Sequence, residues 1–372
     1  MLAVSYSLTI DDSPASAELL AAVREIEVED HAELADMLRL RLAVAVREDG
    51  AAWTVLDEDL FRRLTKLALS VQVGSRQVPL IEAYVIETRS EFSNTPGESM
   101  LEVIAMDPTA LMNLEEKVRA WPDMADSDIA STLFGEYGFD TEVEQTQPTH
   151  QEVDRTEMQR GSDIQFLRRL AHRNGYECYL ELNEDSGRVE GHFHPPRSDQ
   201  SPQGVLSVNL GNATNINSFK ARHDMLGPVS AEAKNLQIGD QSDQEAAISE
   251  QSDTLGEQAL SEQERPCRVL LNDSGLAESG ELQTYAQAVV DRSAWSIRAE
   301  GELSTVTYGD VLRAKRPINV RGAGRQFSGS YYVQKVLHHL SDAGYSQRFS
   351  LKRNASGVTG REDFTDNQAL AS

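Results

Sequence analysis

The chain has 372 residues, of which 60 are Asp or Glu and 35 are Lys or Arg, so its formal net charge is −25 at pH 7. Such a charge repels phosphates and anionic lipids, so neither nucleic-acid binding nor membrane insertion is expected. Two cysteines, Cys178 and Cys267, are too few for a disulfide framework or a four-thiolate zinc site. The first residues lack the basic flank and apolar run of a signal peptide, and no segment approaches the roughly 20 apolar residues of a membrane helix.

Residues 1–107 are predicted to be mostly strands. Between residues 38 and 47, leucine and valine alternate with arginine and alanine, which is the period-two pattern of a strand with one apolar face. The run LTKLALSVQVG repeats this pattern and is followed by a Gly-Ser turn. Many strands with short turns favour a small antiparallel barrel or sandwich. Arg39, Arg41 and Arg47 fit either an inner surface or an ordinary solvated strand face.

Residues 108–203 mix helices and strands. We expect helices in DPTALMNLEEKVRAW and in DSDIASTLFGEYG. A third helix begins at Ser162, which has capping-box spacing to Gln165, and ends at Asn174-Gly175. YECYLEL and GRVEGHFHP are then expected to form a hairpin.

Strands return in 204–239 and again in 303–354, and the tail 355–372 is expected to be loose. No Lys or Arg occurs between Lys234 and Arg265. We therefore interpret 240–264 as a solvated or disordered insertion that contributes little to the core. ELQTYAQAVVDRSAWSIRAEGE predicts an amphipathic helix, which completes an insertion at 240–302. The chain shows no short sequence repeat.

The chemistry-bearing residues have plain structural explanations. His192 and His194 fall on one face of a strand, as in zinc sites, but no third or fourth ligand is evident. Cys178 is interpreted as a buried, unreactive thiol, because no neighbouring sequence suggests an activating base. The sequence Gly322-Ala-Gly324 lacks the remainder of a dinucleotide-binding fingerprint. We therefore predict no catalytic residues, no cofactor and no metal site.

Two blocks of the chain resemble a known family. The first is RGSDIQFLRRLAHRNGYECYLE, and the second is GDVLRAKRPINVRGAGRQFSGSYYVQKVLHHLSDAGYSQRFSLKRN. Both are similar to the phage late control protein D family and to the hub part of VgrG spike proteins. The matching residues to which we assign structural roles are Ser162, Asp163, Phe166, Leu167, Leu170, Gly175, Gly309, Asp310, Gly329, Tyr332, Val333, Val336, His338, Tyr345, Phe349 and Arg353.

The resemblance implies a fold class and a division into parts. The fold would be α+β and mainly β, with two tube-protein-like antiparallel β-barrels and a helix-containing module between them. The first barrel would span 1–107, the connecting module 108–203, and the second barrel 204–239 with 303–354.

The same resemblance implies a function. The chain would be a non-enzymatic baseplate hub that forms a homotrimer and adapts a hexameric inner tube above to a separate trimeric spike protein below. Baseplate wedge proteins would be further partners. Synthesis would be cytoplasmic, with assembly into a phage tail or injection particle. A tail-associated peptidoglycan hydrolase and a monomeric cell-surface binding module are the alternatives.

Overall fold

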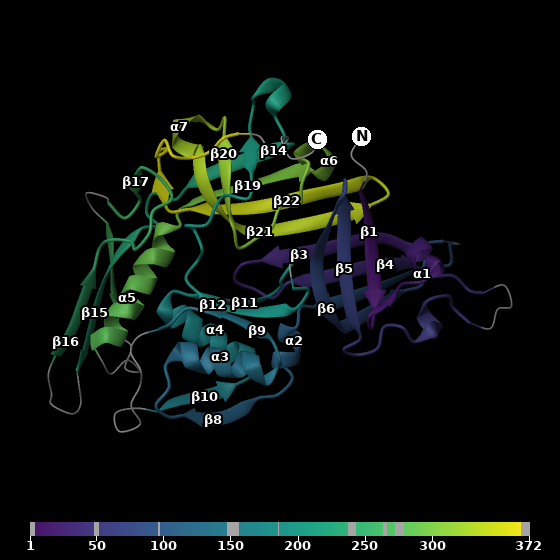
Figure 1. The fold of residues 1–372 in the computed structure, drawn as a ribbon, viewed down its shortest axis with the longest axis horizontal. Coiled ribbons are helices and arrows are strands. Elements are labelled where there is room, and N and C mark those ends of the chain that lie inside the picture. Colours follow the sequence, from purple (N-terminus) through teal and green to yellow (C-terminus); the bar gives the residue numbers. More distant parts are fainter. Residues whose placement is uncertain are drawn as a thin grey trace.

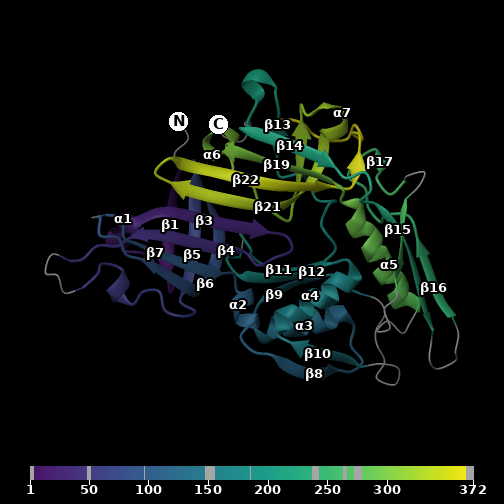
Figure 2. The same ribbon diagram turned by 180° about the vertical axis from the view of Figure 1, so that it is seen from behind.

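The structure is a computed structural model that describes residues 4–47, 52–95, 97–146, 156–184, 186–236, 243–262, 266–271 and 279–365. The described part is mainly β with shorter helices, so the predicted α+β class is confirmed. Its largest sheet has 13 strands (Figures 1 and 2). This sheet consists of two parts, which we call the first and second half-sheets.

The first half-sheet precedes Asp107, and its strands lie side by side in the order β3-β4-β7-β6-β5-β1. The strands are β1 (Val4–Ile10), β3 (Val23–His31), β4 (Met37–Ala43), β5 (Lys66–Val73), β6 (Arg76–Glu91) and β7 (Met100–Met106). The short elements β2 (Ser13–Pro14), α1 (Ala17–Ala22) and η1 (Leu56–Glu58) accompany them. Leu38, Leu40 and Leu42 of β4 are fully buried in the hydrophobic core of the first half-sheet, which we call the first core, while Arg39 and Arg41 face solvent. The alternation along β4 therefore decides which face of the sheet is buried.

The second half-sheet is assembled from segments that are far apart in the sequence, in the order β13-β20-β21-β22-β19-β14. The strands are β13 (Val205–Ser207), β14 (Ser218–His223), β19 (Ile297–Ser304), β20 (Pro317–Arg321), β21 (Gly329–Ser341) and β22 (Gly344–Arg353). The short helices are η2 (Gly211–Ala213), α6 (Thr305–Tyr308) and α7 (Gly324–Phe327). Strand β21 also pairs antiparallel with β3, and we call this β21–β3 ladder the seam. In Figure 1 the yellow β21 and the purple β3 lie side by side there.

The two half-sheets share one strand order. If the six strands of each are numbered along the chain, both sheets read 2-3-6-5-4-1. In both, the fifth strand carries a register shift just after a Tyr-Val pair, Tyr84-Val85 in β6 and Tyr332-Val333 in β21. They differ where the first and fourth strands meet, because β1 and β5 are antiparallel whereas β13 and β20 are parallel. The chain is thus a structural repeat without a visible sequence repeat.

The connecting module lies below the sheet in Figure 1 and packs around its own core. Its elements are α2 (Thr109–Met112), β8 (Lys117–Trp121), α3 (Asp126–Glu136), β9 (Asp140–Val143), β10 (Glu157–Gly161), α4 (Asp163–Asn174), β11 (Glu177–Leu182) and β12 (Val189–His194). The helix predicted up to Trp121 is wrong beyond Met112, because β8 pairs with β10 and buries the Trp121 ring. Among the described residues, no helix is long and apolar enough to cross a membrane.

A small unit is inserted between β14 and β19. It comprises β15 (Val229–Leu236), β16 (Asp243–Ile248), β18 (Cys267–Leu271) and α5 (Ser279–Ala294), and β17 (Gln258–Ala259) pairs with β23 (Ala355–Ser356) beside it. This arrangement corrects the predicted boundaries of the second barrel. β15 belongs to the insertion, whereas β19 belongs to the second half-sheet. The predicted helix ends at Ala294, because the next residues pair with β14 and β22.

The expectation that 240–264 contributes little to the core is wrong for its described part. β16 pairs with β15, and the side chains of Leu255 and Leu260 are buried. Leu260 joins the hydrophobic core of the second half-sheet, which we call the second core, and Leu255 packs in a cluster with Trp295 and Tyr332. The acidic composition of the segment did not reveal that these two leucines are buried, because each packs in an apolar cluster formed by distant segments. Residues 240–242, 263 and 264 lie outside the described residues.

Candidate functional site: an ionic joint and a neighbouring cavity

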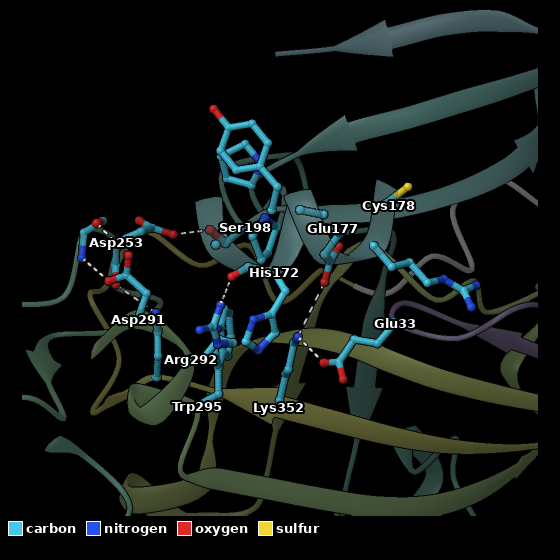
Figure 3. Close-up of a pocket in the computed structure, with 18 of the residues that line it drawn as sticks. Glu33, His172, Glu177, Cys178, Ser198, Asp253, Asp291, Arg292, Trp295 and Lys352 are labelled. Carbon is cyan, nitrogen blue, oxygen red and sulfur yellow. Dashed lines mark hydrogen bonds and ion pairs between the residues drawn. The ribbon is translucent and has the colours of Figure 1, made fainter. Parts of the chain in front are cut away.

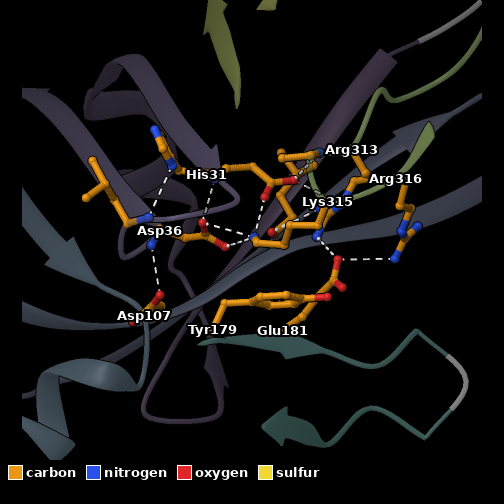
Figure 4. Close-up of polar contacts among 12 residues, drawn as sticks. His31, Asp36, Asp107, Tyr179, Glu181, Arg313, Lys315 and Arg316 are labelled. Carbon is orange, nitrogen blue, oxygen red and sulfur yellow. Dashed lines mark hydrogen bonds and ion pairs between the residues drawn. The ribbon is translucent and has the colours of Figure 1, made fainter. Parts of the chain in front are cut away.

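Lys315 lies at the centre of a buried ionic cluster at the seam (Figure 4). Its side chain is 1% exposed, and its Nζ donates to Asp30 Oδ1 at 2.6 Å and to Asp36 Oδ2 at 2.9 Å. The ammonium also lies 5.1 Å from the centre of the Tyr179 ring. We call this cluster the ionic joint, and its members are Asp30, Asp36, Glu181, Arg313, Lys315 and Arg316.

The ionic joint connects three parts of the chain. Asp30 and Asp36 come from the first half-sheet, residues 313–316 from the loop before β20, and Glu181 from β11 of the connecting module. Arg313 donates to the carbonyls of Pro79 and Leu80 in β6, at 3.1 Å each, and to Glu181 Oε1 at 3.3 Å. A single loop thereby fixes both half-sheets and the connecting module relative to one another.

Electrostatics within the joint favours the ionised Asp30–Lys315 pair. Burial alone would raise the pKa of Asp30, but the charges of Lys315 and Arg313 outweigh it and hold this pKa below its usual value. Burial alone would lower the pKa of Lys315, but Asp30 and Asp36 outweigh it and raise this pKa. At Asp36, burial and the nearby carboxylates of Asp30 and Asp107 raise the pKa well above its usual range. Asp36 is therefore the carboxyl that takes up a proton most readily.

The backbone at Lys315 is itself unusual, with φ +65° in the left-handed region. Non-glycine residues adopt this conformation at a cost, so the surrounding contacts must hold it in place. Ala314 N donates to Asp30 Oδ2 at 2.9 Å, and Lys315 N donates to the carbonyl of Val333 at 2.9 Å. The loop is thus fixed by backbone as well as side-chain bonds.

Sequence reasoning missed the joint entirely. The one available signal was the run Arg313-Ala-Lys315-Arg316, three bases within four residues of a strongly acidic chain. Burial of a charge depends on partners from other segments, so no local pattern could distinguish this run from a solvated basic turn.

The motif residues around α4 hold the connecting module together. Ser162 occupies the N-cap position of α4 but makes no side-chain cap bond, which corrects the expected capping box. Its Oγ instead donates to Asn113 Oδ1 at 2.6 Å. The buried carboxylate of Asp163 accepts bonds from Lys117 Nζ, Tyr137 Oη and Gln159 Nε2, each at 2.6 Å.

In the second half-sheet, two pairs of motif residues meet. Gly329 has φ +132°, and a Cβ there would run into the buried guanidinium of Arg353. Arg353 donates to the carbonyls of Leu255, Ser328 and Gly357, and these bonds tie the insertion to the sheet.

His338 and Tyr345 form the other pair, with the Tyr345 Oη 2.8 Å from His338 Nδ1. Both side chains are buried, and Tyr345 packs against the first core from the second half-sheet. His338 and His339 point to opposite faces of β21, since His339 contacts the solvent-side Glu25.

The remaining motif residues serve packing and turns and do not converge on one site. Phe166, Leu167 and Leu170 pack in the core of the connecting module, and Val333, Val336 and Phe349 pack in the second core. The Tyr332 hydroxyl donates to Glu177. Gly175 ends α4, Gly309 ends α6, and Asp310 pairs with Arg76.

A cavity of about 460 Å³ opens where the connecting module, α5 and β22 meet (Figure 3). At one side, Lys352 Nζ lies 3.1 Å from Glu33 Oε1 and 3.5 Å from Glu177 Oε1, and 5.1 Å from the centres of two aromatic rings, Trp295 and Tyr332. On the other side, Asp291 accepts bonds from the backbone and hydroxyl of Ser252. Lys352 of β22 thus contacts Glu33 next to β3 and Glu177 of the connecting module, whereas Asp291 and Ser252 join two segments of the insertion.

The candidates for chemistry have buried environments. Burial raises the pKa of the Cys178 thiol to about 12, so it stays protonated at neutral pH. Burial lowers the pKa of His192 to about 3, and its Nδ1 lies 3.3 Å from His194 Nε2. Within the described residues, the three-ligand group that could hold a metal is a different one, Glu25, Glu27 and His339. Its two carboxylates already pair with Arg41 and Arg39.

The fold is similar to that of several tail proteins of known structure. A 43 kDa tail protein of prophage MuSo2 from Shewanella oneidensis superposes with a TM-score of 0.66 and 14% identity, over 95% of this chain and 99% of that one. A tail protein from Neisseria meningitidis MC58 gives 0.64 and 13%, over 94% and 97%. An Escherichia coli component of the type VI secretion system, described as similar to tail proteins of bacteriophage T4, gives 0.58 and 12%, over 96% and 79%.

The family follows from the sequence. The model of the Alg8 N-terminal domain family matches residues 4–342, and the chain belongs to that family. No curated protein matches the chain.

Proposed function

We propose that this protein is a structural hub subunit of a contractile tail or a related injection particle. In that role it would form a homotrimer that adapts a hexameric inner tube to a separate trimeric spike, with baseplate wedge proteins around it and no enzymatic activity of its own. Assembly would follow synthesis in the cytoplasm.

The observation that carries the proposal is the shared strand order of the two half-sheets. A protein that joins sixfold to threefold symmetry needs two similar units in each of three chains. Here, one chain supplies two six-stranded sheets of the same order, related by the seam. Three chains would then offer six such sheets to a tube, while the connecting module and the small unit, present once per chain, would offer three copies to a spike.

Light scattering on the purified chain tests the stoichiometry. We expect a particle of about three times the chain mass of 41.1 kDa over a range of concentrations. A chain that stays monomeric, or that forms a hexamer, contradicts the proposal. A reconstruction of the particle with three copies between the inner tube and the spike would establish the role directly.

A further inference from the structure

Within the described part of the 13-stranded sheet, two strand edges are open over the same length of six residues. Ladder bonds on the β5 side of β6 end at Val85, although β6 continues for six more residues, Ile86–Glu91. At the far end of the sheet, the six residues of β14 pair with β19 on one side alone. Open edges carry unpaired backbone groups and are templates for another strand.

The seam shows what such edges do in this fold. β21 is the fifth strand of the second half-sheet, as β6 is of the first. Beyond its own partner β20, β21 continues and pairs with β3, the second strand of the other half-sheet. β14 is likewise a second strand. The chain therefore contains one fifth-to-second contact, and these two edges are the two halves of another.

Burial at equivalent positions differs as a missing partner would require. Counted from the shared register shift, Thr88, Ser90 and Phe92 of the first half correspond to Val336, His338 and Leu340 of the second. The latter three are buried at the seam, whereas the former are exposed, Phe92 by 58%.

The same contrast holds between β3 and β14. In the first half-sheet, Met106 of β7 pairs with Met37 of β4, which pairs with Glu29 of β3. In the second half-sheet, the equivalent row consists of Lys352 of β22, Arg298 of β19 and Arg222 of β14. Arg222 therefore occupies the position that Glu29 has in the first half-sheet. Along β3, positions 25–30 alternate between half-buried and buried, while positions 218–223 of β14 alternate between exposed and half-buried.

We infer that residues 86–92 of one copy pair antiparallel with β14 of a second copy, in the register of the seam. This inference rests on the proposed trimer and specifies its interface. Leu340 pairs with Ile26 at the seam, so Phe92 would pair with Phe219, and Ser90 with Ala221. Glu91 would lie opposite Lys220, a favourable pair of charges. The head-to-tail contact uses different surfaces of each copy, which is the geometry that closes rings.

The side chains support a second copy as the partner. Phe219 already packs against the second core, so Phe92 would extend that core as Leu340 extends the first. β14 carries Lys220, Arg222 and His223 and no acidic residue, in a chain whose net charge is −25. In the register of the seam, Glu91 of the facing segment would lie opposite Lys220, whereas Glu87 would lie opposite Asp224, just beyond β14. Arg89, which would face Arg222, is already compensated by ion pairs with Glu87 and Glu102.

Cysteine pairs test the register. In a Cys267→Ser background, which removes the exposed cysteine, Ser90→Cys with Ala221→Cys should give covalently linked dimers and trimers on a non-reducing gel. The matched control, Ser90→Cys with Lys220→Cys, places the thiols on opposite faces and should give none. Six strands separate β6 from β14 in the sheet order, and Figures 1 and 2 show the two strands apart. A disulfide between residues 90 and 221 would therefore join different copies.

A second variant tests the apolar anchor without relying on cross-linking. Phe92→Glu should shift the particle from about three times 41.1 kDa to 41.1 kDa, while Leu270→Glu, at a similarly exposed residue, should leave it unchanged. Unaltered circular dichroism in both shows that the chain still folds. A wild-type trimer with no Ser90–Ala221 link, or one that survives Phe92→Glu, overturns the inference and leaves the proposed function standing. A monomeric wild type overturns both.

Discussion

Single residues hold this protein together mainly through buried charges rather than through catalytic groups. Lys315 is the clearest case, because its ammonium compensates two carboxylates that are 1% and 9% exposed. A buried ion pair adds little net stability over an apolar packing of the same shape, but breaking it leaves an isolated charge. The joint is therefore better understood as a device that fixes the relative position of the half-sheets.

That reasoning predicts the effect of Lys315→Met. The variant should lose about 3–5 kcal/mol of unfolding free energy, because Asp36 would stay buried without its cation and Asp30 would keep Arg313 alone. Urea denaturation followed by circular dichroism measures this loss. Lys234→Met, which removes the lysine of the exposed pair with Glu245, should change stability by less than about 1 kcal/mol. Equal effects of the two variants would contradict a structural role for the joint.

At the scale of elements, the acidic segment after β16 is part of the core. Gln251 and Asn354 hold it to the end of β22 through bonds to backbone atoms, with Leu255 N donating to Asn354 Oδ1 at 2.9 Å. Its two buried leucines then fill positions beside the second half-sheet. The segment thus closes one side of that sheet.

We therefore expect Leu260→Ala to destabilise the chain by about 2–5 kcal/mol, the usual cost of a cavity in a packed core. Leu270→Ala, in the exposed position on β18, should cost almost nothing. Thermal melting of both variants distinguishes the two outcomes. A Leu260→Ala chain as stable as the wild type would restore the earlier interpretation of a solvated insertion.

The whole molecule carries buried neutral histidines that make it sensitive to acid. Burial lowers the pKa of His338 and of His192 to about 3, compared with about 6.5 in an unfolded chain. Between these two values the unfolded state binds the extra proton, so stability falls as the pH falls from 6.5 towards 3. Each histidine contributes a slope of up to about 1.4 kcal/mol per pH unit.

His338→Gln should flatten this dependence. The variant loses the titrating group, so its unfolding free energy should fall less steeply than that of the wild type between pH 6 and pH 4. The comparison uses slopes, so any uniform loss of stability from the substitution does not affect it. Identical slopes would show that His338 does not stay neutral in the folded chain.

The sequence by itself determined the strands with one buried face, because period-two alternation is a local property that fixes which side of β4 is apolar. It also determined α4, whose apolar spacing and Gly175 stop are local signals. The family blocks implied a mainly β α+β fold with two antiparallel β-barrels, and its mainly β class agrees with the observed fold. Tertiary structure alone decided that β19 joins the second half-sheet, that Leu255 and Leu260 are buried, and that Lys315 meets Asp30. Each of these depends on partners from distant segments, and the free energy of burial belongs to the pair of segments rather than to either one. The repeat and the two matching open edges could likewise be seen in the strand order alone, since the two halves share one strand order but show no sequence repeat.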